Sequence, residues 1–190
     1  MPAIRKIRIR KQYRNVLLDL SLRSKRTREE AEILHIAKLV GVNTPEIFFA
    51  DPNSCEIIME YVHGKLLKDL DGNRRESRKL FEIVGTNTAK LHKRGIIHGD
   101  LTTKNIILSR ERLFFLDFGL SFMSDRLEDK AEDLHLLKQA LKSSMDAQTA
   151  QKCFESVLSG YQSEIGEDLQ RKVRRQILKI EMRGRYASVD

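Results

Sequence analysis

The sequence is poor in cysteine and proline and contains no long apolar run. Its two cysteines, Cys55 and Cys153, stand outside any Cys-x-x-Cys or Cys/His cluster, which excludes a disulfide framework and a cysteine-based zinc site. Isolated thiols are typical of a reducing compartment, so we expect a cytoplasmic protein. No segment reaches the length of a membrane span, and no apolar stretch of a signal peptide follows the basic start of the chain. We therefore expect no membrane association.

The composition is that of a folded protein. Hydrophobic residues make up 41% of the 190 positions and charged residues 33%, which leaves enough apolar material for a core. This length allows one ordinary domain or a pair of small lobes. No internal repeat is present, and the absence of proline after Pro52 excludes a proline-rich linker.

Positive charge gathers near the two ends of the chain. The net charge is +8, residues 5–28 hold ten Lys and Arg against Asp19 alone, and a second basic cluster runs through residues 171–185. Such clusters attract polyanions such as RNA. They are equally typical of solvated helix faces, and charge patterning alone does not separate the two.

Apolar periodicity and turn residues predict the order of the elements. Thr27 and Glu30 have the spacing of a capping box, which predicts a helix over residues 27–40 that Gly41 ends. Two apolar runs, 46–50 and 55–62, are separated by turn residues and predict a hairpin. A helical stripe from residue 77 to 93 precedes His98, and two short strands follow at 106–108 and 113–116. Helices are expected near 129–144, 147–162 and 167–182.

The segment with the clearest chemistry runs from His98 to Asn105 and continues at Asp117-Phe118-Gly119. Asp100 and Asn105 are five positions apart, as in the kinase pattern H-R-D-x-x-x-x-N, and Asp117 begins a D-F-G motif. Phosphoryl transfer needs a carboxylate that orients the attacking hydroxyl and oxygen ligands that hold Mg²⁺ against the phosphates. We predict Asp100 for the first role and Asn105 and Asp117 for the second. Each residue alone could serve a turn, but the combination favours the catalytic interpretation.

Further candidates lie on the N-terminal side of this segment. The second hairpin strand ends at Glu60-Tyr61-Val62, where a kinase hinge offers backbone groups of Glu60 and Val62 to adenine. Lys6 lies in the segment 5–11, which could form a strand, and Glu30 lies on the first helix, so the two are candidates for the phosphate-binding Lys and its helix Glu. The basic residues next to Lys6 are alternatives for the first of these roles. The capping box is the alternative explanation for Glu30. We expect His98 to be a hydrogen-bonding member of the loop rather than a base.

Two departures from the kinase pattern bear on regulation. Gly99 replaces the arginine of H-R-D, which pairs with a phosphorylated activation loop in many regulated kinases. A helix follows Gly119 by about residue 129, with no A-P-E motif between them. We therefore expect neither control by loop phosphorylation nor a conventional platform for a protein substrate.

Nearly the whole chain resembles the Bud32 family of atypical kinases. The resemblance rests on Lys6-Ile7-Arg8, Lys11-Gln12-Tyr13-Arg14, the run 26–31, the loop 98–105, the run 117–120, the run 128–134 and Arg183-Gly184-Arg185. It implies an α+β, two-lobed, protein-kinase-like fold with a minimal C-lobe, and an atypical Ser/Thr protein kinase or ATPase that uses ATP and Mg²⁺. It also implies a subunit of the KEOPS complex, which supports threonylcarbamoyladenosine formation on tRNA, with Kae1-type and Cgi121-type subunits as partners.

This resemblance gives the chain a predicted division. Residues 1–62 are expected to form a partial N-lobe of strand, helix, hairpin and hinge, and residues 63–190 a helical C-lobe with the catalytic loop and a basic tail. The family places two strands and a phosphate-covering loop before the Lys strand, whereas Lys6 is only five residues from Met1. A truncated start, a longer or fused polypeptide and a true loss of the loop are all compatible with this sequence. For the chain as it stands we expect weakened nucleotide affinity.

The basic tail gains a specific interpretation from the resemblance, because a tRNA partner would take phosphate contacts from Arg183 and Arg185. Two other functions stay open. A small-molecule phosphotransferase of the aminoglycoside-kinase type also carries H-G-D-x-x-x-x-N, although only 71 residues follow Gly119. A non-catalytic tRNA-binding scaffold is the second alternative, favoured by the basic surface and the short N-terminal segment.

Overall fold

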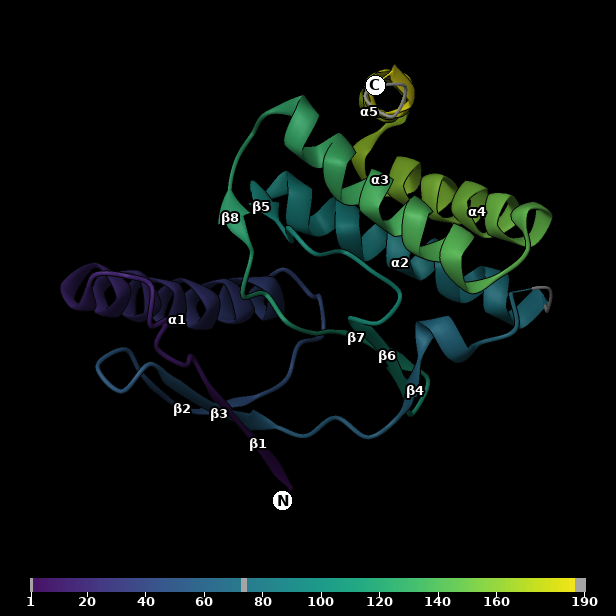
Figure 1. Cartoon of the computed structure of the whole chain (residues 1–190). Helices are drawn as coiled ribbons and strands as arrows, with labels where there is room; N and C mark the ends of the chain where they lie inside the picture. The colour runs from purple at the N-terminus through teal and green to yellow at the C-terminus, as the bar shows by residue number, and fades with distance from the viewer. Residues whose placement is uncertain (1, 73–74, 187–190) are drawn as a thin grey trace.

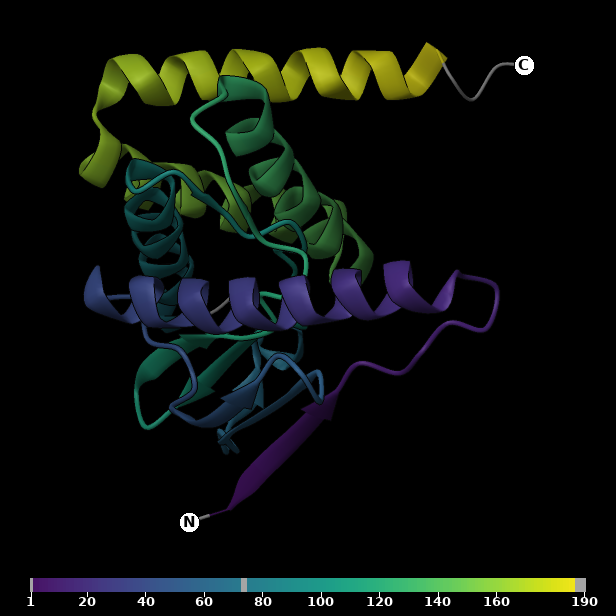
Figure 2. The same cartoon turned by 90° about the vertical axis from the view of Figure 1, so that its left-hand side faces the viewer.

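The structure, a computed structural model, describes residues 2–72 and 75–186, without the side chains of residues 75–76 and 184–186. A small sheet with one long helix forms one part of the molecule, and a group of helices forms the other (Figure 1). In both views the helix α5 (Glu167–Tyr186) lies at the opposite end of the molecule from β1 (Ala3–Ile7), with α1 (Val16–Leu39) between them (Figure 2). Residues 61–64 link the two parts, and the division predicted after residue 62 stays a prediction.

The sheet in the first part has the order β1-β3-β2 and is antiparallel throughout. The predicted hairpin is confirmed, since β2 and β3 pair with each other across a turn in which Asp51 accepts hydrogen bonds from the backbone N–H groups of Asn53 and Ser54. In the register of β1, Lys6 lies opposite Ile57 of the central strand. The strands are β1 (Ala3–Ile7), β2 (Ile47–Asp51) and β3 (Glu56–Glu60).

The first helix, α1 (Val16–Leu39), begins eleven residues before the predicted start at 27. Asn15 caps it by accepting hydrogen bonds from the backbone N–H groups of Leu17 and Leu18. The predicted capping box is therefore wrong: Thr27 lies inside the helix and donates its hydroxyl to the Arg23 carbonyl. The apolar stripe marked only the C-terminal half of α1, because the leucines of its first turns are exposed.

Two further small sheets connect the first part to the helices. The predicted strands at 106–108 and 113–116 are present as a hairpin, whose turn residues Arg110 and Glu111 both have positive φ. The elements are β4 (Lys65–Leu66), the 3₁₀ turn η1 (Leu67–Asp69), β5 (Ile96–Ile97), β6 (Ile106–Ser109), β7 (Arg112–Phe115) and β8 (Phe122–Met123).

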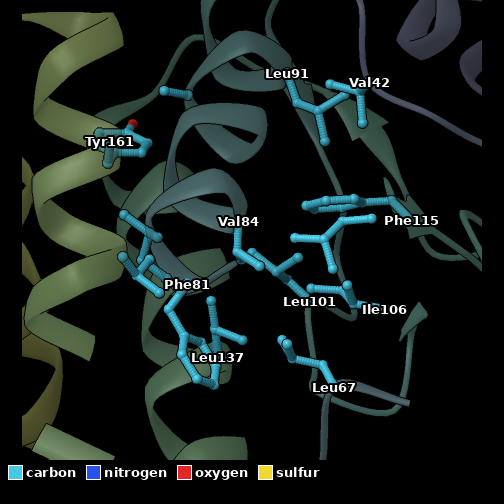
Figure 3. Close-up of a cluster of buried hydrophobic side chains, with 14 of the residues drawn as sticks. Val42, Leu67, Phe81, Val84, Leu91, Leu101, Ile106, Phe115, Leu137 and Tyr161 are labelled. Atoms are coloured by element: carbon cyan, nitrogen blue, oxygen red, sulfur yellow. The ribbon is translucent and has the colours of Figure 1, made fainter. Parts of the chain in front are cut away.

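The helical part contains the four remaining predicted helices and most of the core. Its helices are α2 (Arg75–Lys93), α3 (Leu127–Ser144), α4 (Ala147–Ile165) and α5 (Glu167–Tyr186). The core joins α2 and α4 to the segment that follows α2, through Phe81, Tyr161, Leu101 and Phe115 (Figure 3). The helices α2 and α4 can approach closely because Gly160 has no side chain. A Cβ at this position would stand 1.8 Å from the Glu82 carbonyl oxygen. The segment of residues 98–105 is thus carried on a packed core.

Candidate active site

A cleft of about 660 Å³ separates the β1-β3-β2 sheet from the β6-β7 hairpin. All of the candidate residues in the first part, together with Asn105 and Asp117, line it. The residues at its two ends differ in character, so the cleft has an apolar end and a charged end. The apolar lining comprises Ile4, Met59, Val62, Leu66, Ile107 and Leu116.

Glu60 and Val62 lie where the chain leaves β3 and crosses to the second part, and both line the cleft. The backbone N–H of Glu60 donates to the Glu46 carbonyl at 2.8 Å, and that of Tyr61 donates to the Pro2 carbonyl at 3.1 Å. These bonds fix the direction in which the chain leaves the sheet. Val62 is buried against the apolar end of the cleft.

Lys6 joins three elements at the charged end. Its Nζ lies 2.7 Å from Glu30 Oε1 on α1 and 2.6 Å from Asp117 Oδ1 in the segment after β7. The structure therefore brings together three predicted residues that are far apart in the sequence. Because Thr27 does not cap α1, the capping-box explanation of Glu30 no longer applies, and its buried carboxylate faces Lys6 instead.

The ionisation of Asp117 depends on Lys6. Desolvation by burial opposes ionisation and would raise the pKa of Asp117, but the hydrogen bond and charge of Lys6, with the backbone N–H of Gly119, outweigh it. The pKa of Asp117 consequently lies below its ordinary value. Asp117 also has a φ of 54°, a left-handed conformation that is uncommon for a residue with a side chain and often marks a functional site.

Asp100 and Asn105 are bonded to each other within the loop after β5. The Asn105 Nδ2 donates to the Asp100 carbonyl oxygen at 2.9 Å and to Asp100 Oδ2 at 2.8 Å. Because both bonds use the amide nitrogen, the Asn105 side-chain oxygen is left as the group that can bind a cation. The Leu116 N–H donates to the Asn105 carbonyl at 2.8 Å, which brings the residue before Asp117 against this loop.

His98 is fully buried beneath the loop and holds it by hydrogen bonds, as expected. A backbone N–H can only donate, so the Asp100 N–H donates to His98 Nδ1, and the proton on Nε2 is donated to the Leu116 carbonyl at 3.1 Å. Desolvation by burial lowers the pKa of His98 despite the opposing charges of Asp133, Asp100 and Asp117. The imidazole is therefore neutral and structural.

Gly99 is required by the geometry of the loop. Its φ is +77°, and a Cβ at this position would stand 2.2 Å from the Leu120 carbonyl oxygen. No side chain fits there without a backbone shift. The position of the H-R-D arginine is therefore occupied by a residue that has to be glycine in this loop.

Asp133 has a role in the site that was not predicted from the sequence. This buried residue of α3 accepts hydrogen bonds from the backbone N–H groups of His98 at 2.6 Å and Gly99 at 2.8 Å. His92 Nε2 lies 3.2 Å from the same carboxylate, and His92 Nδ1 lies 2.9 Å from the Tyr161 hydroxyl. The sequence contains one sign of this role: Asp133 is an acid that lies between Ala131 and Leu134 on the apolar face of the predicted helix.

Arg8 was also missed as a neighbour of the site. Its Nη2 lies 2.5 Å from Glu30 Oε2, so Glu30 binds a cation on each of its oxygens. The signal in the sequence was its position two residues after Lys6, since alternate residues of an extended strand project to the same side. Because several other basic residues surround Arg8 in the sequence, this spacing alone did not single it out.

The basic residues predicted for RNA lie far from this cleft on α5. Arg183 is exposed, and its Nη2 forms an ion pair of 2.7 Å with Glu128. Arg185 lies in the last turn of α5, and its side chain is outside the described part of the structure. In the described residues, no helix has the combination of length and apolar character that crossing a membrane requires.

The residues at the charged end include possible ligands for Mg²⁺. Among the described residues no group of three or more His, Cys, Asp and Glu converges on one point. Mg²⁺ usually keeps several waters and takes one or two carboxylates together with substrate phosphates, so a site with Asp117 and Asn105 suits a nucleotide-bound ion. The lowered pKa of Asp117 also keeps this ligand deprotonated.

Known proteins share similarity with nearly the whole chain. Residues 3–133 match the family model of the protein kinase domain. The KEOPS complex subunit Bud32 of Pyrococcus abyssi is 45% identical over 183 residues, which cover 95% of this chain and 83% of that protein. A probable bifunctional tRNA threonylcarbamoyladenosine biosynthesis protein of Methanothermobacter thermautotrophicus is 44% identical over 97% of this chain, but the match spans only 33% of that relative.

Solved structures confirm the predicted fold class. The Rio2 kinase of Chaetomium thermophilum, in a complex with ADP, Mg²⁺ and phosphoaspartate, superposes with a TM-score of 0.57 at 16% identity. The superposition covers 90% of this chain and 61% of the Rio2 chain, and at this identity it bears on the fold alone. The kinase-like fold, the match to the kinase domain model and the identity to Bud32 together show that the chain belongs to the Bud32 family of atypical protein kinases.

Proposed function

We propose that this chain is an ATP-dependent phosphotransferase or ATPase and that it acts, as a KEOPS-type subunit, in threonylcarbamoyladenosine biosynthesis on tRNA. The observation that supports this most directly is the cleft, because its apolar end suits the base of a nucleotide and its charged end suits the phosphates. Family membership supports it further and favours it over a small-molecule phosphotransferase of the aminoglycoside-kinase type.

Adenine would occupy the apolar end of the cleft. Met59 and Val62 come from the first part of the molecule, and Ile107 and Leu116 come from the second, so a flat ring between them would contact apolar side chains on both faces. The backbone of Glu60 and Val62 lies at the edge of this space and would bind the polar rim of the base. This assignment follows from their position at the exit of β3.

The phosphates would lie at the charged end, where Lys6 would bind them while Glu30 holds its ammonium group. Asp117 and Asn105 would hold Mg²⁺, which neutralises phosphate charge when it is bound. Lys6 contacts Asp117 directly in this structure. With a nucleotide bound, Asp117 would bind the cation and Lys6 would bind the phosphates.

Asp100 would orient the hydroxyl or water that attacks the terminal phosphate. One carboxylate oxygen, Oδ2, accepts the hydrogen bond from Asn105 and so has a fixed direction. The second oxygen is left to accept a proton from the attacking group, which is the role of a general base. The identity of the phosphate acceptor stays outside this proposal.

The partners and location are proposed from the named relatives. The Pyrococcus protein is named as a KEOPS complex subunit, and on this basis we propose a Kae1-type and a Cgi121-type subunit as partners. The bifunctional relative is named for tRNA threonylcarbamoyladenosine biosynthesis, which supports tRNA as the nucleic acid. The two buried free thiols, Cys55 and Cys153, fit the cytoplasm.

The exposed basic face of α5 favours an additional binding role. Arg183 would contact a tRNA phosphate after leaving its exposed pair with Glu128, and such pairs contribute little to stability. The double substitution Arg183→Ala and Arg185→Ala should therefore weaken tRNA retention by the assembled complex and flatten its dependence on salt. Unchanged retention across a salt series would remove these residues from the proposal.

The central test is phosphate release from Mg·ATP, measured for the chain alone and with the Kae1-type subunit and tRNA. We expect activity in the wild type and its loss in Asp117→Ala and Asp100→Ala, because each substitution removes a carboxylate that this mechanism requires. If the wild type with its partners releases no more phosphate than the two variants, the chain is a scaffold rather than an enzyme. Retained tRNA binding in that case would support the scaffold role.

A further inference from the structure

Glu30 is bound by two cations rather than one. Its side chain is 1% exposed, its Oε1 contacts Lys6 Nζ at 2.7 Å, and its Oε2 contacts Arg8 Nη2 at 2.5 Å. Lys6 alone would neutralise the buried carboxylate, so the second cation needs a separate explanation. Its effect is geometric, because a carboxylate bound at both oxygens cannot rotate away from either partner.

The backbone of Arg8 is fixed on both sides of its Cα. Its N–H donates to the Cys55 carbonyl at 3.0 Å, which continues the pairing of β1 with β3. Its carbonyl accepts from Arg23 Nη1 at 3.0 Å. Arg23 in turn donates its Nε to the buried carboxylate of Asp19 at 2.6 Å, one turn earlier in α1.

These contacts form one connected latch between β1 and α1, made of Asp19, Arg23, Arg8 and Glu30. The bonds of Arg23 to Asp19 and to the Arg8 carbonyl hold the main chain after β1 against the early turns of α1. The bond of the Arg8 side chain holds Glu30, which lies further along the same helix. Glu30 in turn contacts Lys6, so the position of α1 is linked by direct contacts to the charged end of the cleft.

Stability alone does not account for an arginine at this position. The Nη1 of Arg8 is buried and makes no hydrogen bond within the described residues. A buried donor without a partner is unfavourable, and an apolar side chain of similar length would avoid it. Arg8 also lies against the D-F-G turn, because a Cβ at Gly119 would stand 3.3 Å from its Nη2 and 3.2 Å from Lys6 Nζ.

We propose that Arg8 is a positioning residue for the phosphate end of the cleft. It holds Glu30 so that Oε1 stays directed at Lys6 before any nucleotide binds, and it thereby keeps α1 docked on the cleft. This proposal rests on the proposed function for its catalytic consequence. Only seven residues connect Gly119 to the start of α3. This is too short for an activation segment that could position α1, which agrees with a positioning role for Arg8.

The test compares three variants of the full chain with the wild type. Arg8→Met retains the length of the side chain without its charge, and Arg8→Lys retains the charge with a single nitrogen. Arg10→Met is the matched control, since Arg10 is exposed and lies two residues further along the same segment. Thermal unfolding of each variant shows whether the fold is retained.

The first measurement needs no nucleotide. The rate at which an acylating reagent labels the Lys6 amine is followed by mass spectrometry. Arg8→Met should label Lys6 several-fold faster than the wild type, because Glu30 is then free to turn away, while Arg8→Lys should be intermediate and Arg10→Met unchanged. An unchanged Lys6 rate in Arg8→Met overturns the proposal, whether or not the chain binds ATP.

The second measurement is steady-state ATP hydrolysis. Arg8→Met should lower kcat about tenfold, with a smaller change in KM, because a misplaced Lys6 reduces transition-state stabilisation more than binding. The loss should nearly disappear when Arg8→Met is made in a Glu30→Gln background, since both then act through one contact. Equal losses in both backgrounds overturn the proposal. Failure of the wild type to bind Mg·ATP in calorimetry would instead contradict the proposed function and leave the labelling result to decide on Arg8.

Discussion

The backbone N–H of Gly99 donates to Asp133 Oδ1 at 2.8 Å, which joins the catalytic loop to a buried acid of α3 that lies 34 positions later. The other carboxylate oxygen accepts from the His98 N–H at 2.6 Å. Two consecutive backbone groups are thus fixed by one side chain. Asp100 follows them directly, so its position depends on a helix that contributes nothing to the lining of the cleft.

Replacing Asp133 by asparagine tests this dependence. Asparagine has one acceptor oxygen where the carboxylate has two, so one of the two backbone N–H groups would face an amide NH₂ and stay unpaired. An unsatisfied buried donor costs about 1–3 kcal/mol, and the free energy of unfolding in urea should fall by about this amount. ATP hydrolysis should fall more steeply than stability, because the loop that carries Asp100 is released.

The control for this substitution is Glu132→Gln, at the exposed neighbouring position of α3. It removes one negative charge from the same helix without touching the loop, and we expect both stability and activity to stay close to those of the wild type. If Asp133→Asn behaved like Glu132→Gln, Asp133 would not hold the catalytic loop.

His98 should make the protein less stable on mild acidification. Desolvation lowers the pKa of His98 in the folded chain, so as the pH falls through about 6.5 the unfolded chain takes up a proton that the folded chain does not. Stability from this group is therefore complete above about pH 6.5 and is lost as the pH falls toward the folded pKa. The contribution to the slope is at most about 1.4 kcal/mol per pH unit.

Urea unfolding of the wild type and of His98→Gln between pH 5 and 8 measures this slope. His98→Gln should be less stable at neutral pH but should lose less stability below about pH 6.5. His35→Gln is the control, because His35 is exposed on α1. Parallel stability curves for the wild type and His98→Gln would show that His98 takes up its proton equally in both states.

Lys6 should determine the ionisation of Asp117. In Lys6→Met the hydrogen bond and the charge that lower the Asp117 pKa are gone, while desolvation still raises it, so the pKa should move upward. In the wild type the depressed pKa contributes stability above the unfolded value of about 4, and this is lost as the pH falls through the folded value. Carboxyl ¹³C chemical shifts through a pH titration measure the change.

Arg5→Met provides the comparison for this titration. Arg5 is the adjacent residue of β1, and its guanidinium pairs with Glu56 at 2.7 Å rather than with Asp117. It removes the same charge from the same strand, and the Asp117 titration should stay in place. A shift of equal size in both variants would mean that net charge, rather than the Lys6 contact, lowers the pKa.

Much of this fold was predictable because its signals are local. The hairpin turn at Asp51 and the apolar stripes of the later helices lie within short windows of sequence, and the structure has them where they were predicted. The start of α1 was not predictable from a stripe, because its first turns are anchored by Asn15 and by the buried Asp19 rather than by apolar packing. Asp133 and Arg8 act on residues distant in the sequence, and only the tertiary structure brings them together.

The glycine in place of the H-R-D arginine leads to a last prediction. Gly99→Ala combines two costs: a left-handed φ of +77°, and a Cβ that would stand 2.2 Å from the Leu120 carbonyl oxygen. The first is about 1 kcal/mol for a residue with a side chain, and the second forces the backbone beside Asp100 to shift. We expect Gly99→Ala to unfold at clearly lower urea concentration than the wild type and to hydrolyse little ATP.

Gly166→Ala separates these two costs. Gly166 has a similar φ of +87°, but no atom of the described residues lies within 4 Å of where its Cβ would stand. Its substitution should therefore show the conformational cost alone and leave ATP hydrolysis intact, since the residue lies between α4 and α5. Gly166, at φ 87° and ψ 158°, lies in a region that is essentially restricted to glycine, so the excess loss of stability in Gly99→Ala over Gly166→Ala is a lower bound on the cost of the contact with Leu120. If Gly99→Ala lost less stability than Gly166→Ala and kept its ATP hydrolysis, the loop would have room for a side chain, and the absence of the arginine would need a cause other than sterics.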